Sequence, residues 1–498
     1  MSRKLVLHPL AILFIGATLF IGEISSGTSL YFAAMATSAV SFACITYNIL
    51  GGLGSISGIA FTRLALSTIV ISQFGKVLTF ERADTNLDVP RLTITVYAVY
   101  YCFLMLGSFA FSRIRLPLPK PAEPRTLTQS RHLYMVALAG GLVGVIGLTI
   151  LGFAGGNANV SLTHGFLRAL SYLLPFSLVL AVDDRIRTTN GAHSFGWMVF
   201  WPFLVMMLQG FLGASRAGFL EPLAIVAVTC YLRGFRFRRK HVALALILGA
   251  SFFFFVSPFY LYARGFRGES SIREQATAML TALESAPGRW ATITRSVGEE
   301  ALANPGAVNY FSTPGAATLN RFALIGPDST LINACSTGFH YGWTALRLDF
   351  IGSLPRFIYR NRPDIGSGNY LGQLDGQEGD EIETTTYSTI TTISDSFGSF
   401  GWISVMLFSF FAVPAAFVVY ESIFDVRQPW GTVGTVLLFF SLTEGSMGGI
   451  IFDVIVRQPI YILVLSWCAN WLIGIMPVSG DRAIAVKQST YGSIVAGR

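Results

Sequence analysis

Long apolar stretches recur through almost the whole of this 498-residue chain and limit what it can fold into. Only 12% of the residues are charged, whereas a soluble globular protein carries about 25%. A helix that crosses a membrane needs roughly 20 mostly apolar residues. About 12 stretches meet or approach this requirement: residues 11–21 with their flanks, 31–50, 58–78, 92–111, 135–153, 166–182, 195–212, 219–232, 242–262, 402–419, 433–442 with their flanks, and 455–475.

This pattern predicts an all-α fold, a polytopic membrane helix bundle of about 12 spans. The stretch 58–78 is the weakest of these spans, because it carries Arg63 and Lys76 and a charged side chain is costly in lipid. The basic start of the chain leads into the first apolar run without a clear small-residue cleavage site. The sequence therefore predicts a first membrane anchor there rather than a removable signal peptide.

The positions of the basic residues predict the orientation of the bundle. The formal net charge is +8, and cytoplasmic loops of membrane proteins are enriched in Lys and Arg. Alternating spans bring the basic clusters to one face, which we assign to the cytoplasm together with both termini. These clusters are Arg3 and Lys4; Arg113, Arg115, Lys120, Arg125 and Arg131; Arg185 and Arg187; Arg233, Arg236, Arg238, Arg239 and Lys240; and Arg482, Lys487 and Arg498. This placement explains the basic balance without nucleic-acid binding.

One long polar segment interrupts the series of apolar stretches. It divides the sequence into an N-terminal bundle (1–263, about nine spans), a loop domain on the non-cytoplasmic side (264–399), and a C-terminal part with the last spans and a cytoplasmic tail (400–498). The loop contains more aromatic and apolar residues than a disordered segment would. We therefore expect it to form a folded cap, with short helices at 316–325 and 330–339.

Six arginines are candidate ligands for a diphosphate group, because the guanidinium fork donates paired hydrogen bonds to phosphate. Arg216 lies in a short turn between two apolar stretches, where an unpaired charge is costly. A structural salt bridge is the simpler interpretation of any single loop arginine, since the loop has fourteen acids, and its ten Arg without Lys reflect a chain with 30 Arg and 5 Lys. The loop candidates are Arg264, Arg267, Arg321, Arg356 and Arg360.

Three residues are candidates for a general base that activates a hydroxyl group, a role that needs a carboxylate or an imidazole near the acceptor. Asp395 directly precedes the span that begins at Trp402, Glu444 lies near the last two spans, and His340 lies in the loop. A lone histidine is more often structural than catalytic, so His340 is the weaker candidate.

Metal and nucleotide chemistry have no motif in this sequence. Four of the five cysteines fall in predicted spans, which leaves Cys335 alone in the loop and excludes a disulfide within it. There is no cluster with zinc-ligand spacing, no P-loop, and no serine-hydrolase or zinc-protease motif. We therefore expect neither a metal nor a cofactor.

Three short segments together resemble the O-antigen polymerase and ligase superfamily of bacterial inner membranes. Residues 213–221 (GASRAGFLE) look like the SRG-type segment of that family, whose functionally important arginine maps to Arg216. Residues 354–363 (LPRFIYRNRP) look like its "PR…P" segment late in the outer loop, with Arg321 upstream. Residues 395–402 (DSFGSFGW) look like the aromatic–glycine segment that returns to the membrane. The Arg-x10-Gly spacing of some members is not matched, because Ser367 stands at that distance from Arg356.

The resemblance implies a membrane glycosyltransferase of the periplasmic face of the inner membrane, without a cofactor. Its donor is an oligosaccharide linked to undecaprenyl diphosphate, and the lipid diphosphate is the leaving group. Membrane lipid and a chain-length regulator protein are the further partners that the resemblance implies. Positive charge placed at the leaving group is the expected form of catalysis, which would be supplied by Arg216, Arg264, Arg321 and Arg356.

Two other functions stay open on the sequence alone. One is a ligase of the same superfamily that moves a glycan to a lipid or protein acceptor. The other is a flippase or transporter of lipid-linked glycans. A transporter more often shows paired repeats and broken or charged helices in mid-membrane, whereas the polar residues of this chain concentrate in one loop.

Overall fold

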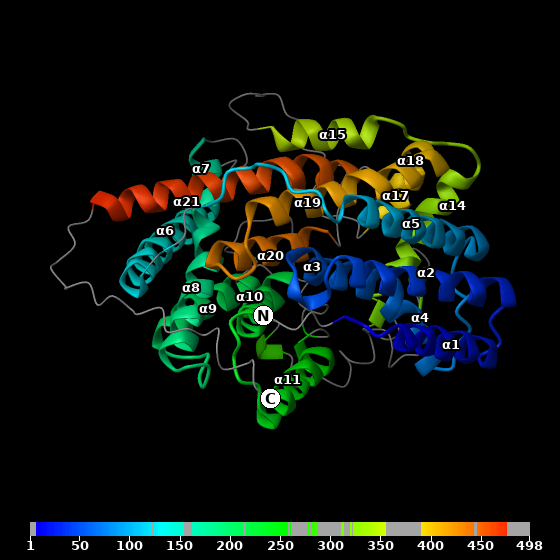
Figure 1. Cartoon of the computed structure of the whole chain (residues 1–498), viewed down its shortest axis with the longest axis horizontal. Coiled ribbons are helices and arrows are strands. Elements are labelled where there is room, and N and C mark those ends of the chain that lie inside the picture. Colours follow the sequence, from blue (N-terminus) through cyan, green and yellow to red (C-terminus); the bar gives the residue numbers. More distant parts are fainter. Residues whose placement is uncertain are drawn as a thin grey trace.

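The computed structural model describes residues 6–121, 124, 126–153, 162–212, 216–256, 259, 277, 280–281, 283–285, 310–312, 319–320, 322–354, 390–442 and 446–475. Every regular element in these ranges is a helix, as Figure 1 shows. The N-terminal half contains α1 (Pro9–Ser25), α2 (Leu30–Ile49), α3 (Ile56–Ala65), α4 (Ile71–Leu78), α5 (Pro90–Phe111), α6 (Leu127–Phe153), α7 (Leu162–Ser171), α8 (Leu173–Thr188), α9 (Trp197–Leu212), α10 (Arg216–Leu232) and α11 (Arg239–Ser251). The predicted all-α class is confirmed.

Residues after position 310 add the helices that form one end and one side of the bundle. These are α14 (Ile325–Ser336), α15 (Thr344–Ser353), α17 (Thr392–Phe400), α18 (Trp402–Leu407), α19 (Val413–Ile423), α20 (Pro429–Ser441) and α21 (Gln458–Ile475). Four π-helical segments adjoin α-helices: η2 (Leu66–Val70), η3 (Phe252–Val256), η5 (Phe408–Ala412) and η6 (Gly449–Arg457). A 3₁₀-helix, η1 (Gly52–Gly54), follows α2.

Among the residues that the structure describes, seven helical segments are long and apolar enough to cross a membrane, which makes the chain a multi-pass membrane protein. These segments are Leu30–Gly54, Ile56–Leu78, Pro90–Phe111, Leu127–Leu151, Phe166–Thr188, Trp402–Ile423 and Gly449–Trp471. Four shorter apolar helices lie among the other predicted spans: Pro9–Ser25, Trp197–Phe211, Gly218–Leu232 and Pro429–Ser441. Proline at the first helical position starts α1, α5 and α20, where its missing N–H removes no intrahelical hydrogen bond.

The span that carries Arg63 and Lys76 lies inside the protein. In Ile56–Leu78, 72% of the most apolar 18-residue stretch is buried inside the protein, whereas the corresponding value for Leu127–Leu151 is 33%. The Arg63 guanidinium donates to the carbonyl oxygen of Phe439 over 3.2 Å and lies over the Phe440 ring. Lys76 Nζ is 2.7 Å from Glu81 Oε2. These charges therefore meet protein groups rather than lipid, which explains how an apparently weak span is tolerated.

Three connections that carry arginine gather with the connection between α8 and α9 at one end of the bundle, here called the basic end. It comprises residues 112–121, 189–196, 233–238 and 424–428. The Leu116 amide donates to Ser422 Oγ over 2.9 Å, and the Arg236 amide donates to the Gly191 carbonyl over 3.0 Å. Acids close to this end pair with its arginines: Arg131 with Asp184 at 2.9 Å and Arg233 with Asp183 at 3.1 Å.

The described parts of the long loop from residue 310 onward gather at the other end, here called the loop end. There the connections 26–29 and 79–89 meet residues 310–312, 322–354, 390–401 and 446–448. The Ser29 amide donates to Asp84 over 3.0 Å, Asn86 to the Tyr310 carbonyl over 3.1 Å, and the Asp88 amide to Ser329 Oγ over 3.0 Å. In Figure 1, α14 and α17 lie beside one end of α5.

One predicted loop helix starts earlier than expected. The sequence predicted helices at 316–325 and 330–339, whereas the structure has a single helix Ile325–Ser336 across the second prediction. Pro327 falls in the first turn of α14, where proline costs no helical hydrogen bond. Of the first predicted helix, only residues 319–320 and 322–325 are described.

Candidate functional site

The loop returns to the bundle through α17, and a buried carboxylate holds this helix in place. Asp328 of α14 is fully buried. Its carboxylate accepts hydrogen bonds from Tyr97 Oη at 2.5 Å, the Thr391 amide at 2.9 Å and Ser394 Oγ at 2.6 Å. A fourth bond comes from the Thr391 hydroxyl at 2.5 Å. One side chain therefore joins α5, α14 and the start of α17.

Asp328 is satisfied by neutral donors rather than by a cation. Burial raises the pKa of its carboxyl above the ordinary value, although the hydrogen bonds from Ser394, Thr391 and Tyr97 favour the charged form. A second hydrogen bond between these helices runs from Tyr100 Oη to Thr392 Oγ1 over 3.1 Å. Such a network fixes one arrangement of the helices, because each lost donor or acceptor leaves a buried polar group unpaired.

Asp395, predicted as a catalytic base, lies in the interior of the loop end. Its side chain is 1% exposed. One oxygen accepts from Tyr341 Oη at 2.5 Å and the other from the Met447 amide. Burial raises the pKa of Asp395 to about 6, while the bonds from Tyr341 and Met447 oppose that rise. Both oxygens are therefore occupied, and in this arrangement Asp395 positions α17 against the segments around residues 341 and 447.

His340, the second predicted base, is exposed beside the same helix. Its ring contacts the Phe397 ring edge-on, with centroids 5.9 Å apart. The neighbouring Tyr341 amide donates to the Gly398 carbonyl over 3.1 Å. A side chain at Gly398 would overlap the Tyr341 ring, and Gly401 turns the chain with φ of +65°, a conformation that favours glycine. The close packing of this turn holds His340 at the surface.

A third acid of the loop end lies next to Asp395. Asp349 of α15 accepts a hydrogen bond from Ser446 Oγ, and the Gly448 backbone comes close to its side chain. The Asp349 charge contributes to the raised pKa of Asp395, as does Asp328. Asp328, Asp349 and Asp395 therefore form one electrostatically coupled group that ties α14, α15 and α17 to the start of the last helix.

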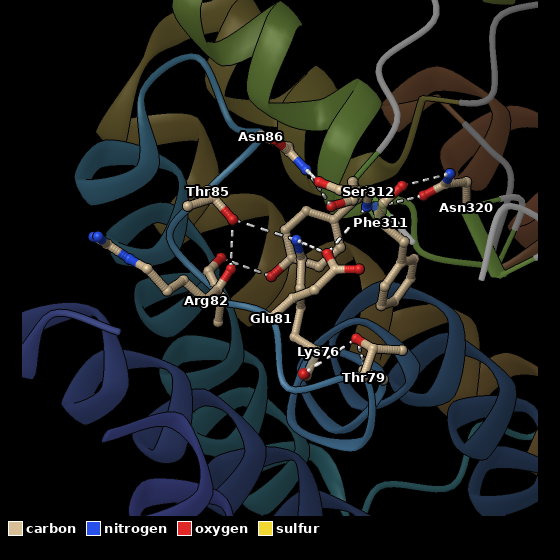
Figure 2. A network of polar contacts seen from close by, with 12 residues as sticks. Lys76, Thr79, Glu81, Arg82, Thr85, Asn86, Phe311, Ser312 and Asn320 are labelled. Carbon is tan, nitrogen blue, oxygen red and sulfur yellow. Dashed lines mark hydrogen bonds and ion pairs between the residues drawn. The ribbon is translucent and has the colours of Figure 1, made fainter. Parts of the chain in front are cut away.

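A separate polar network fixes residues 310–312 to the turn after α4, as Figure 2 shows. Glu81 lies between two donors: Lys76 Nζ at 2.7 Å and the Ser312 amide at 3.0 Å. Lys76 is fully buried and lies 4.6 Å from the centre of the Tyr310 ring. Tyr310 Oη donates to the Ala83 carbonyl over 2.8 Å. Residues far apart in the sequence thus lock together through one buried ion pair.

Most of the predicted site residues lie where the structure does not describe side chains. Arg216 begins α10, which places its backbone at a helix N-terminus, but its side chain is not described. The remaining predicted diphosphate ligands and the third predicted base lie outside the described residues: Arg264, Arg267, Arg321, Arg356, Arg360 and Glu444. Their roles stay predictions. Among the described residues, Asp395 and His340 both lie at α17, where Asp395 is buried and His340 is exposed.

Sequence reasoning missed the residues that hold this end together. Asp328, Tyr341 and Asp349 are not among the predicted site residues, because a single acid or tyrosine in a loop has no motif. One signal was present for Asp328, since it lies among apolar residues in the helix sequence IGPDSTLI, where an acid must be either buried with partners or at a helix edge.

Within the described ranges, no group of three or more His, Cys, Asp or Glu side chains is arranged to hold a metal ion. The chemistry that this end offers is hydrogen bonding from hydroxyl groups, buried carboxylates and an exposed imidazole. No protein-family model, curated protein or solved structure matches this chain.

Proposed function

We propose that the protein is a polysaccharide polymerase of a bacterial inner membrane. It joins oligosaccharide repeat units carried on undecaprenyl diphosphate, with lipid diphosphate as the leaving group. In this proposal the loop end faces the periplasm and both termini lie in the cytoplasm. The paired arginines of the basic end support that orientation, since cytoplasmic loops carry the excess of Lys and Arg.

The observation that carries the proposal is the exposed His340 in a turn that is hydrogen-bonded to the end of α17, at the end where the long loop docks. His340 sits against Phe397 of α17, and the buried Asp395 and Tyr341 hold that helix. Arg216 begins α10 in the turn after α9. A base and a cation at one membrane surface are what transfer from a lipid diphosphate requires.

The reaction follows from these roles. A hydroxyl group of the acceptor glycan attacks the anomeric carbon of the donor sugar, and His340 accepts the hydroxyl proton. The bond between that carbon and the diphosphate oxygen breaks, and the oxygen keeps the electron pair. Arg216 and the loop arginines Arg264, Arg321 and Arg356 stabilise the negative charge on the departing diphosphate.

Surface polysaccharide from a deletion strain carrying variants of this gene tests the proposal. Arg216→Ala is expected to abolish long-chain polymer and leave single repeat units, at a protein level equal to wild type. Arg115→Ala is the matched control, because Arg115 is an exposed arginine of the basic end, 3.9 Å from Glu421. Its polymer should keep the wild-type length.

Three results would reject the polymerase. Unchanged long-chain product in Arg216→Ala removes the central cation from the mechanism. Polymer of normal length that is no longer joined to its final acceptor assigns the protein as a ligase. Lipid-linked units trapped on the cytoplasmic face of the deletion strain assign it as a flippase.

A further inference from the structure

Glu23 of α1 is a buried acid that the proposed reaction does not use. Its side chain is fully buried, with 0% exposure. Neither of its carboxylate oxygens has a hydrogen-bond partner within the described ranges, whereas the buried Asp328 and Asp395 both accept hydrogen bonds. A carboxylate without partners is too costly to keep ionised in a protein interior, so such a group takes up a proton instead.

Among the described residues around Glu23, both cations already belong to other acids. Helix α1 packs mainly against α2 and α4. The Lys76 ammonium of α4 is 2.7 Å from Glu81, and in the following turn Arg82 pairs with Asp84 at 3.1 Å. Asp84 is close enough to Glu23 for their like charges to interact. Helix α2 has no charged residue, and its titratable groups are Tyr31, Cys44 and Tyr47.

The long loop reaches this acid through residues 310–312, here called the docked segment. Tyr310 is fully buried. Burial raises the pKa of its phenol far above the ordinary value, the charge of Glu23 raises it further, and a contact with Gln73 opposes the rise. Gln73 of α4 is also fully buried, and in the described part of the chain its carboxamide atoms have no hydrogen-bond partner. Glu23, Gln73 and Tyr310 therefore meet at one buried place between α1, α4 and the loop.

A proton on Glu23 suits the groups at this place better than a metal cation does. A protonated carboxyl group both donates and accepts hydrogen bonds, and so does a carboxamide. Neutral Glu23 can therefore donate to the Gln73 oxygen, which an ionised carboxylate cannot do. A metal cation would be repelled by the Lys76 ammonium, which lies 4.6 Å from the centre of the Tyr310 ring.

The docked segment, which Figure 2 shows beside the turn after α4, keeps water away from this place. Phe311 packs so closely on α4 that a Cβ atom at Gly75 would lie 2.6 Å from its ring. The neighbouring Tyr310 Oη donates to the Ala83 carbonyl over 2.8 Å. Release of the segment would let water reach Glu23, and hydration lowers the cost of ionising it. Protonation of Glu23 and docking of the segment therefore favour each other.

We infer that Glu23 is a proton-binding site and that its proton couples the surrounding pH to the docking of residues 310–312. With the proton bound, the segment stays docked. Loss of the proton leaves an unpaired charge next to Tyr310 and favours release. The docking constant is expected to fall about tenfold per pH unit, from the pH at which an exposed glutamic acid ionises to the pH at which the docked one does. This site does not depend on the reaction proposed above.

Hydrogen–deuterium exchange of the full-length protein in phosphatidylcholine nanodiscs, followed at residues 310–312 from about pH 5 to about pH 9, tests the coupling. After correction for intrinsic exchange rates, wild-type protection is expected to fall about tenfold per pH unit over part of this range. Glu23→Gln imitates the neutral acid, so its protection should stay constant. Asp425→Asn is the matched control, because it removes an exposed acid of the basic end, and it should follow wild type.

A second measurement detects the proton itself. The infrared difference spectrum of wild type minus Glu23→Gln at neutral pH should contain the C=O stretching band of a protonated carboxyl group. Absence of this band would overturn the proton-binding site. Equal pH dependence of exchange in wild type and Glu23→Gln would reject the coupling, since Lys76 or Tyr310 would then be the titrating group. Wild-type protection that does not vary with pH would reject the coupling as well.

Discussion

The two ends of this bundle treat buried charge in opposite ways. At the basic end each buried or half-buried acid faces an arginine, as in the pairs of Asp183 with Arg187 at 2.9 Å and with Arg233 at 3.1 Å. At the loop end Asp328 and Asp395 are buried as fully as Asp183, but hydroxyl and amide donors satisfy them. The basic end therefore relies on ion pairs between its acids and its arginines. The loop end depends on exact hydrogen bonding and on protonation.

The largest effect is expected from removing the central acid of the loop end. Asp328→Ala leaves the hydroxyls of Tyr97, Thr391 and Ser394 without their acceptor in a buried place. We expect a loss of about 3 kcal/mol or more in the free energy of unfolding, measured by thermal unfolding in detergent. Asp425→Ala at the basic end is the control, because Asp425 is exposed and its carboxylate accepts the Arg427 amide of its own turn. Equal losses in both variants would remove the contrast between the ends.

The buried ion pair between Lys76 and Glu81 is an exception at the loop end, where Asp328 and Asp395 are satisfied by neutral donors. Breaking this pair should give the next largest loss of stability. Glu81→Gln leaves the buried Lys76 ammonium without its ion-pair partner, which is expected to cost about 2–4 kcal/mol. The double variant Lys76→Met with Glu81→Gln should recover part of this loss, since an apolar replacement removes the unpaired charge. A double variant that is less stable than Glu81→Gln alone would show that the pair itself is worth more than its desolvation.

The raised pKa of Asp395 predicts that the stability of the loop end depends on pH. Its folded-state pKa is about 6 against an ordinary value of 3.8, so the protonated form is favoured by folding. Its contribution to stability is complete below about pH 4 and is lost as the pH rises through about 6, on the order of 3 kcal/mol in all. The unfolding temperature of wild type minus that of Asp395→Asn should therefore fall over this range. Parallel curves for the two proteins would contradict the assignment.

The smallest effect is expected at a half-exposed pair of the basic end. Arg131→Ala removes the partner of Asp184, but the arginine is 51% exposed. Solvent screens such a pair, so the change in unfolding free energy should stay within about 1 kcal/mol. An effect as large as that of Asp328→Ala, in the same thermal assay, would mean that this ion pair stabilises the basic end as strongly as the buried hydrogen bonds stabilise the loop end.

The fold class was predictable from sequence because each membrane-spanning helix requires a continuous run of apolar residues. Runs of apolar residues such as 92–111 specify a helix without knowledge of any partner. The stretch 58–78 was harder, since Arg63 and Lys76 lower its apolar character. Only the packed bundle shows that these side chains face Phe439 and Glu81 rather than lipid.

The candidate site was predictable only in part, because it depends on contacts between distant residues. Asp395 and His340 were chosen for their chemistry and their place near a returning span, and both do lie at α17. Which of them is buried depends on Tyr341 and Met447, and no local pattern encodes that contact. Asp328 was missed for the same reason: its partners come from α5 and from residues 391–394.

The bonds of Asp328 also set an order for synthesis of the chain. Tyr97, Asp328 and Thr391 reach one another across separations of 231 and 63 residues. A ribosome that has completed α5 has made only one of the three partners, and a product truncated before α17 would keep Asp328 and Tyr97 without Thr391 and Ser394. The hydrogen bonds of Asp328 are therefore complete only after α17 has been made. Chains that end before α17 leave polar groups of α14 unpaired, a feature that cellular quality control can recognise.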